Sequence, residues 1–291
     1  GSTGGTGMKW RGRRGSRNTV DRRRSGGRVG TAGGIGGVGL IAVLAIGYFL
    51  GIDVTPFLSQ GGGGAPVQQS RQLSASEEEA GQFVSVVLAD TEDVWGAVFR
   101  DDLRQTYAPA ELVLFSGATQ SACGSASAAT GPFYCPPDRR IFLDTDFFVT
   151  LDRQLGAGGD FAAAYVVAHE VAHHVQNLLG ILDHANRERA RVDEAASNEI
   201  SVRIELQADC FSGIWARYAE DRLGTVERGD LAEAMNAAAS IGDDTLQRRS
   251  GGAVRPDSFT HGTSEQRQEW FARGYDAAEI GACDTFSARR L

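Results

Sequence analysis

The stretch VAHEVAHHVQ, residues 167–176, holds three of the protein's five histidines and limits more than any other feature what this chain can be. The surrounding run of alanine, valine and leucine predicts one helix, which Asp160 can cap and Gly180 would end. On a helix, His169 and His173 lie one above the other, about 6 Å apart along the axis and on nearly the same face. Two imidazoles in this position can bind one Zn²⁺, and we predict that they do.

Glu170 directly follows the first of these histidines and completes an HExxH arrangement, HEVAH in this chain. Zinc acidifies water, and a carboxylate at this position can take up the proton and pass it to a leaving amine. The alternative is a buried helix with hydrogen-bonded histidines, in which a carboxylate in such an apolar run would have no purpose. His174 points about 100° away from His173, so we do not expect it to be a ligand.

A third ligand must come from elsewhere in the chain. A further histidine six residues after His173 would mark one type of zinc peptidase, but Leu179 stands there, so that type is excluded. His184 comes eleven residues after His173 and is typical of a surface turn, which makes it a poor candidate. The remaining option is a glutamate on the next helix.

Three glutamates compete for that role: Glu194, Glu199 and Glu205. Glu205 stands in ELQADCF, the most apolar part of its helix, with Asp209 four residues further on and so on the same face. We favour Glu205 as the third ligand over the other two. Asp209 would then accept a hydrogen bond from a ligand histidine and fix its tautomer.

The N-terminal part of the chain carries a membrane signal. Between Met8 and Arg28 there are nine basic residues and one acid, and residues 29–52 (VGTAGGIGGVGLIAVLAIGYFLGI) follow without a charge. Such a span is about long enough to cross a bilayer, and a basic flank before it is the positive-inside pattern. We predict a cytoplasmic arm over residues 1–28, a single transmembrane helix over 29–52 and an exported body. A cleaved signal peptide is the alternative.

Charge excludes one class of partner for the rest of the chain. The net charge is -8 overall, and without the basic stretch the remainder is at -16. A body so acidic argues against nucleic-acid binding, although the arm alone resembles a nucleic-acid arm. Residues 53–75, with a run of four glycines, predict a flexible tether before a domain over 76–291. Residues 1–7 precede a plausible start at Met8 and are left out of the fold reasoning.

All four cysteines follow the predicted span, and an even number on the exported side favours disulfides over a zinc site, since no CxxC spacing exists. Cys123 and Cys135 bracket a short loop rich in Ser, Ala and Gly, so we pair them with each other. This leaves Cys210 to pair with Cys283.

Periodicity predicts a mostly helical α+β domain with a small sheet. A helix is expected from Ser76, where Ser76 and Glu79 form a capping-box pattern. Three more are expected over 194–223, 227–248 and the segment SEQRQEWFARGY, after the histidine helix. ELVLF (111–115) and RRIFLD (139–144) read as short strands, and we expect the edge of the second to pair with an extended peptide.

The segments HEVAHHVQ, ELQADCFSGIWA, GPFYCPPD and DSFTHGTSEQR, together with the opening MKWRGRRGSRN, resemble the bacterial neutral zinc metallopeptidase family, whose members carry an N-terminal anchor. More widely the chain is similar to gluzincin peptidases, in which an ExxAD or ExxSD motif on a following helix completes HExxH. The resemblance implies a zincin-like domain with His169, His173 and Glu205 as zinc ligands, Glu170 as general base and Asp209 behind the ligands.

The segment THGTSEQR also resembles a late segment of membrane-associated gluzincins of the prenyl-protein-peptidase kind. His261 and Arg267 keep the six-residue spacing of that segment, while Gly262 replaces its proline. Gluzincins need a donor to the oxyanion besides the metal, and His261, the only late histidine, is our candidate. The alternative is a residue at the entry of the last helix.

Together these features predict a membrane-anchored zinc endopeptidase that acts on peptides or proteins and does not bind nucleic acid. A zinc-binding scaffold of the cell envelope without turnover is the rival, and the presence of Glu170 speaks against it. The sequence does not indicate the preferred cleavage site or the oligomeric state.

Overall fold

The structure is a computed structural model and describes residues 9–24, 72–127, 131–147, 160–224, 226, 228–240, 242–244, 248, 254–255 and 259–291. Within these ranges no helix combines the length and the apolar composition needed to cross a membrane. The span expected over 29–52 and nearly all of the tether over 53–75 lie outside the described residues, so the structure gives the predicted transmembrane helix no support.

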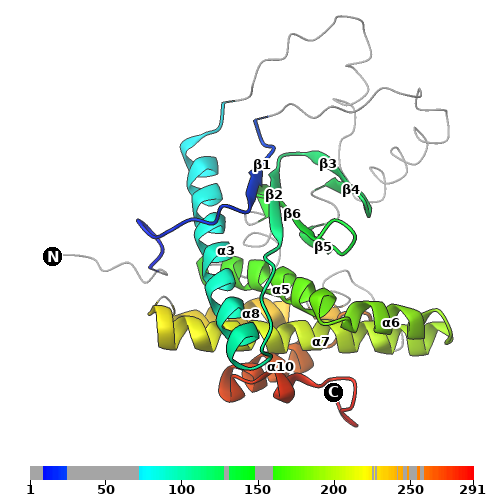
Figure 1. Ribbon diagram of the computed structural model, residues 1–291. Helices are drawn as coiled ribbons and strands as arrows, with labels where there is room; N and C mark the ends of the chain where they lie inside the picture. The colour runs from blue at the N-terminus through cyan, green and yellow to red at the C-terminus, as the bar shows by residue number, and fades with distance from the viewer. Residues whose placement is uncertain are drawn as a thin grey trace, which may run out of the picture. The chain divides into compact units, whose positions relative to one another are not determined.

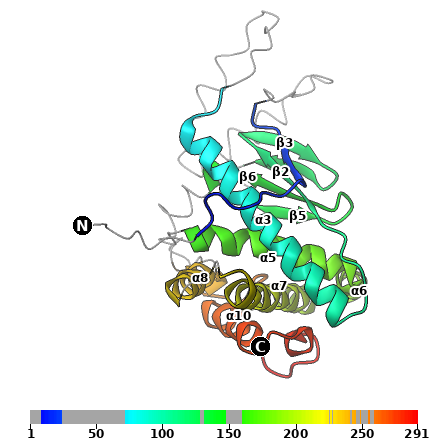
Figure 2. The same cartoon turned by 60° about the vertical axis from the view of Figure 1, so that its left-hand side comes forward.

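Helices dominate the described residues and a small sheet accompanies them, which confirms the α+β class. In Figures 1 and 2, helix α5 lies between the sheet and the group formed by α7, α8 and α10. The helices are α3 (Ala75–Asp101), α5 (Asp160–Leu178), α6 (Ile181–Arg189), α7 (Glu194–Tyr218), α8 (Arg228–Ser240) and α10 (Ser264–Ala277). A π-helical turn (Ala219–Leu223) extends α7, and a 3-10 turn (Ile280–Cys283) follows α10.

The first helix of the domain, α3, begins slightly earlier than the sequence pattern predicted. Its N-cap is Ser74, whose hydroxyl accepts from the backbone N–H of Glu77 at 3.2 Å, while the Glu77 carboxylate accepts from the Ser74 N–H at 2.8 Å. The expected box of Ser76 and Glu79 was therefore two residues too late, because both pairs have the same spacing.

The sheet has the order β1-β2-β6-β5. Strands β1, β2 and β6 run parallel and β5 is antiparallel to β6, while β3 and β4 form a separate hairpin. The prediction that β6 offers an edge to a peptide was wrong, because β2 and β5 pair with it on both sides; among the described strands the edges of this sheet are β1 and β5, and β5 is the one beside β6. The strands are β1 (Thr19–Asp21), β2 (Glu111–Phe115), β3 (Ala118–Ser121), β4 (Gly124–Ser127), β5 (Phe133–Cys135) and β6 (Arg140–Asp144).

Strand β1 comes from the basic N-terminal stretch. We expected that stretch to be an arm apart from the domain, but residues 9–23 and residues 73–291 belong to one compact unit. The stretch adds a strand to the edge of β2 and runs along α3. A three-residue strand flanked by arginines leaves little trace in a hydrophobicity pattern, which explains why sequence reasoning missed it.

Helices α7 and α10 cross closely, and this crossing sets the position of the residues behind the histidine helix. A Cβ at Gly274 would lie 1.8 Å from the carbonyl oxygen of Cys210, and one at Gly213 would lie 2.0 Å from that of Phe271. Only glycine allows the two backbones to approach so closely. The approach brings Arg267 of α10 onto α7.

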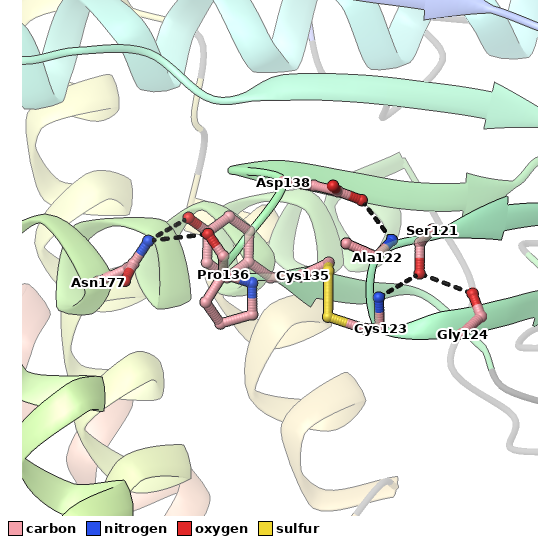
Figure 3. The surroundings of a disulfide bond; sticks show 9 residues. Ser121, Ala122, Cys123, Gly124, Cys135, Pro136, Asp138 and Asn177 are labelled. Carbon is pink, nitrogen blue, oxygen red and sulfur yellow. Dashed lines mark hydrogen bonds between the residues drawn. A yellow bond between two sulfur atoms is a disulfide. The ribbon is translucent and has the colours of Figure 1, made fainter.

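Both predicted disulfides are present, and no cysteine is free. Cys210–Cys283 joins the centre of α7 to the end of the chain, and both cysteines are fully buried. Cys123–Cys135 ties the turn between β3 and β4 to the edge strand β5, as Figure 3 shows. Close to this disulfide, the Asn177 side-chain amide of α5 donates to the Pro136 carbonyl oxygen at 3.4 Å. The edge strand is thus held next to the histidine helix.

Candidate metal centre

The structure brings together the three residues predicted to bind zinc. One ligand atom from each of His169, His173 and Glu205 lies within 4.8 Å of the other two. The Nε2 atom of His169 is 2.9 Å from one oxygen of the Glu205 carboxylate, and the Nε2 atom of His173 is 3.4 Å from the other. Two imidazole nitrogens and a carboxylate oxygen are a donor set that Zn²⁺ accepts in catalytic sites, and the chain fits such an ion.

A buried hydrogen-bond network orients His169. Asp209 is completely buried and accepts from the Nδ1–H of His169 at 3.0 Å, which leaves Nε2 facing Glu205. The same carboxylate accepts from Arg267 at 2.8 and 3.2 Å and from the hydroxyl of Tyr165. Sequence reasoning expected Asp209 in this place, but it did not expect Tyr165 to be part of the network.

A second network, which sequence reasoning missed, orients His173. Its Nδ1–H donates to the side-chain oxygen of Gln176 at 2.8 Å. The amide nitrogen of Gln176 in turn donates to the Ile204 carbonyl and to the Gln207 side chain, both at 2.9 Å, so its oxygen must face the histidine. Gln176 is fully buried. In the sequence, a glutamine within an apolar helix one turn after His173 could have indicated this role. A buried amide needs hydrogen-bond partners for both its oxygen and its nitrogen.

Charges at the cluster favour the arrangement that a cation needs. Burial would lower the pKa of His169, but Asp209 and Glu205 outweigh it and raise that pKa to about 10. Burial would raise the pKa of Glu205, but His173 and His169 hold it well below its ordinary value. The two imidazoles thus favour the ionised form of Glu205, and an ionised carboxylate beside two imidazole rings suits a cation.

Glu170 stands beside this cluster and carries the property expected of a general base. The residue is 9% exposed and lines the same cleft as the three candidate ligands. Burial raises the pKa of its carboxyl group above the ordinary value, despite the nearby histidines. A carboxylate whose pKa is raised toward neutral pH is a better proton acceptor for catalysis than a fully solvated one.

The cleft has a volume of about 620 Å³ and combines an apolar wall with the polar cluster. Residues Pro132, Phe133 and Tyr134, at the edge strand β5, form one side, and Leu182 and Ile204 of the helices line it as well. Such a mixture of apolar walls and a few charged groups is typical of substrate sites.

His261 also lines this cleft, on the loop before α10. The Asp243 carboxylate accepts hydrogen bonds from three successive backbone N–H groups, those of Thr260 (2.9 Å), His261 (2.7 Å) and Gly262 (3.0 Å). The His261 ring lies 3.3 Å from the other Asp243 oxygen, and this contact raises the pKa of His261. Nothing in the sequence near Asp243 pointed to this role.

Tyr134 also lines the cleft and has a hydroxyl that could donate to an oxyanion, but this hydroxyl is engaged within the protein. The Nε2–H of His174 donates to the Ala108 carbonyl at 2.7 Å, so its Nδ1 accepts from the Tyr134 hydroxyl, also at 2.7 Å. Burial lowers the pKa of His174, in keeping with a neutral ring. Asn177 donates to the same hydroxyl at 2.9 Å. Tyr134 and His174 thus join β5 to α5, and His174 points away from the metal cluster as expected.

The rejected ligand candidates lie elsewhere. Glu194 is exposed in the first turn of α7, and His184 is exposed on α6. Glu199 is 59% exposed and pairs with Arg203 at 2.7 Å. None of these three belongs to the metal-ligand group formed by the described residues.

Comparison with known proteins agrees with the site. The family described as "Putative neutral zinc metallopeptidase" matches residues 8–286. The chain belongs to this family. The Escherichia coli K12 protein named "Uncharacterized protein YpfJ" is 45% identical over 96% of this chain and 99% of its own length. The Mycobacterium tuberculosis H37Rv protein named "Uncharacterized protein Rv2575" is 42% identical over 73% of this chain and 74% of its own length. No solved structure matches the chain.

The description of this family names zinc, which agrees with the donor set of the cluster. The match begins at Met8 and ends shortly before the C-terminus, so it includes the basic stretch as well as the metal centre. The family's description thus points to zinc and to a hydrolase acting on peptides. The roles of individual residues rest on the geometry described above.

Proposed function

We propose that this chain is a zinc-dependent endopeptidase in which Glu170 is the general base. The observation that carries this proposal is the position of Glu170, buried in the cleft wall beside three residues that suit zinc. A scaffold that only holds a metal does not need this carboxylate, and burying it carries a cost in free energy. The cleft favours an enzyme over a scaffold for that reason.

The reaction divides between the metal and the chain's own residues. Bound zinc would supply a Lewis acid that polarises a carbonyl and lowers the pKa of water. His169, His173 and Glu205 would hold the ion, and Asp209 and Gln176 fix the orientation of the two imidazole rings. Glu170 takes a proton from the attacking water and gives it to the leaving amine.

His261 is the proposed donor to the developing oxyanion. It lies in the cleft wall and faces the same space as Glu170. The contact with Asp243 favours the protonated ring, and a charged donor is stronger than a neutral one. The second candidate, Tyr134, donates its proton to His174 and is less suited to the role.

The substrate class follows from the edge strand. Among the described strands, β5 pairs with β6 alone, and its residues Phe133 and Tyr134 line the cleft. An extended peptide can add to such an edge by backbone hydrogen bonds, which suits a peptidase that cleaves within a chain. The two disulfides favour an oxidising, extracytoplasmic compartment for this domain. We also propose that residues 29–52 attach the domain to the cell membrane without a single crossing of the bilayer, because the segments before and after them form one unit.

The decisive test changes Glu170 to glutamine. Glu170→Gln keeps shape but cannot accept a proton, so zinc should stay bound while peptide-library digestion falls by at least about 10². Glu205→Ala should lose zinc itself, and Glu199→Gln serves as a control that changes neither. Full digestion by Glu170→Gln with zinc bound would exclude Glu170 as the base, and zinc binding without digestion in the unaltered chain would favour the scaffold.

A further inference from the structure

We propose that the basic N-terminal segment, residues 9–23, is a permanent part of the peptidase domain and lies in the same compartment as the metal centre. The partner of this segment is the face of α3 and the edge of β2 in its own chain. The proposal concerns the architecture around the site and does not depend on catalysis.

Backbone pairing fixes the register of the segment. Thr19, Val20 and Asp21 pair in parallel with Leu112, Val113 and Leu114. Two further hydrogen bonds flank this pairing, from Leu112 N–H to Asn18 O at 2.8 Å and from Arg22 N–H to Leu114 O at 2.7 Å. Without β1, the buried strand β2 would be an open edge with unpaired backbone groups, which proteins generally avoid.

Buried side chains anchor the segment as a domain core would. Trp10 is 6% exposed and packs edge-on against Phe83 of α3, with ring centroids 5.4 Å apart. Arg13 forms a two-pronged ion pair with Asp90, at 2.6 and 2.7 Å, and the Asp90 side chain is only 3% exposed. A buried carboxylate without such a partner would be strongly destabilising, so α3 needs Arg13.

The surface of α3 is shaped for this segment. Arg23 is 4% exposed and donates to Asp21 and to the backbone carbonyl of Glu77. It lies over Gly81, where a Cβ would come within 2.4 Å of its guanidinium. Glycine in the middle of a helix is unfavourable by roughly 0.5–1 kcal/mol relative to alanine, so its presence here serves the close contact.

Charge complementarity accounts for much of the basic composition. Several arginines that suggest a cytoplasmic flank have partners on α3, and further hydrogen bonds from Ser16 and Asn18 reach Glu92. The exposed pairs are Arg11–Glu79 and Arg14–Asp93. These charges have a role within the fold and therefore need not indicate a cytoplasmic location. A segment docked in this way cannot lie across a membrane from α3.

Engineered cysteines test the docking directly. A Cβ at Gly15 would lie 3.5 Å from the Cβ of Ser85 on α3, within the range that a disulfide requires. In the full-length chain, Gly15→Cys with Ser85→Cys should form a third intramolecular disulfide, seen by mass mapping of the unreduced protein. Gly15→Cys with Gly96→Cys is the matched control, because eleven residues along a helix place the second cysteine about 16 Å further away.

Each outcome of this experiment is decisive. A link between the peptides of residues 15 and 85 in one chain, without one in the control, supports the docking. Absence of the link while Cys123–Cys135 and Cys210–Cys283 are oxidised would overturn it. A link between two chains would also overturn it, because it would assign the segment to a second copy.

A labelling experiment in cells tests the shared compartment separately. Arg11 is 75% exposed and Glu199, on α7, is 59% exposed, so single cysteines at either site are open to a membrane-impermeant maleimide. We expect Arg11→Cys and Glu199→Cys to label alike in intact spheroplasts, either both or neither, and both after lysis. Labelling of one and protection of the other would place the two segments on opposite sides and refute the proposal.

Discussion

Two aspartates each fix a histidine that lines the cleft, and they do so by different means. Asp209 is completely buried and accepts from the side chains of His169, Tyr165 and Arg267, which come from two other helices. Asp243 keeps slight contact with solvent, at 9% exposure, and accepts mainly from the backbone of one loop, with His261 as its side-chain partner. Each aspartate positions one histidine toward the same cleft.

The difference follows from solvent access. A charge with no exposure must be neutralised by an opposite charge, and Arg267, itself 2% exposed, meets that need for Asp209. Asp243 can rely on backbone dipoles and on water, because its side chain is 12% exposed and its partner His261 is 51% exposed. Asp209 should therefore influence the stability of the whole domain, and Asp243 only the geometry of its loop.

The largest effect is expected from Arg267→Met, which removes the charge that neutralises Asp209. Breaking a buried pair on one side typically lowers the free energy of unfolding by about 3–5 kcal/mol, and zinc affinity should fall as His169 loses its fixed orientation. Arg187→Met is the control, since its pair with Asp183 is exposed on both sides and contributes at most about 0.5 kcal/mol. Chemical denaturation measures both. Equal losses of unfolding free energy in the two variants would show that burial does not determine how much each ion pair contributes.

The next effect concerns the disulfide beside Asp209. Cys210–Cys283 closes a loop of 73 residues, and its removal by paired serine substitutions should reduce stability by about 4 kcal/mol, with weaker zinc binding. Cys123–Cys135 closes 12 residues, and its removal should reduce stability by about 3 kcal/mol with zinc binding unchanged. Denaturation and metal titration of both variants test this contrast. If both variants lost zinc affinity equally, the Cys210–Cys283 disulfide would have no special role in positioning the metal ligands.

The sequence predicted the part of the site that depends on local spacing. His169 with His173, and Glu205 with Asp209, are each four residues apart, so helix geometry alone placed them on common faces. Asp243 and β1 escaped prediction because their partners lie far along the chain and the segments are short. The error over β6 has a similar origin. Local spacing does not show which strands pair, and it is the pairing of β5 and β2 with β6 that removes β6 from the edge of the sheet.

Asp243→Asn should have a smaller effect that is confined to turnover. The amide oxygen can still accept from the loop, so zinc content should not change, but the positive charge on His261 loses its counter-charge. We expect kcat to fall by roughly 10-fold or more. Since Asp243 raises the pKa of His261, the alkaline limb of the rate profile should move to lower pH. An unchanged limb would mean that His261 does not act as a protonated donor.

The smallest effect is the pH dependence of stability at the Asp243–His261 pair. The pKa of His261 is raised in the folded state, so its contribution is fully present below its unfolded value of about 6.5 and disappears as the pH rises through the folded value. The pKa of Asp243 is lowered, so its contribution is present above its unfolded value of about 3.9 and disappears as the pH falls through the folded value. Stabilisation by the pair should therefore be greatest near pH 5.

His261→Ala should lower the melting temperature more at pH 5 than at pH 8. The difference should be small, because the ring is half exposed. The penalty of Arg267→Met should be the same at both pH values, since Arg267 stays charged and the pKa of Asp209 is lowered. Melting curves of both variants at saturating zinc decide the point: a His261→Ala penalty that does not vary with pH would show that the ring acts there by packing and not by charge.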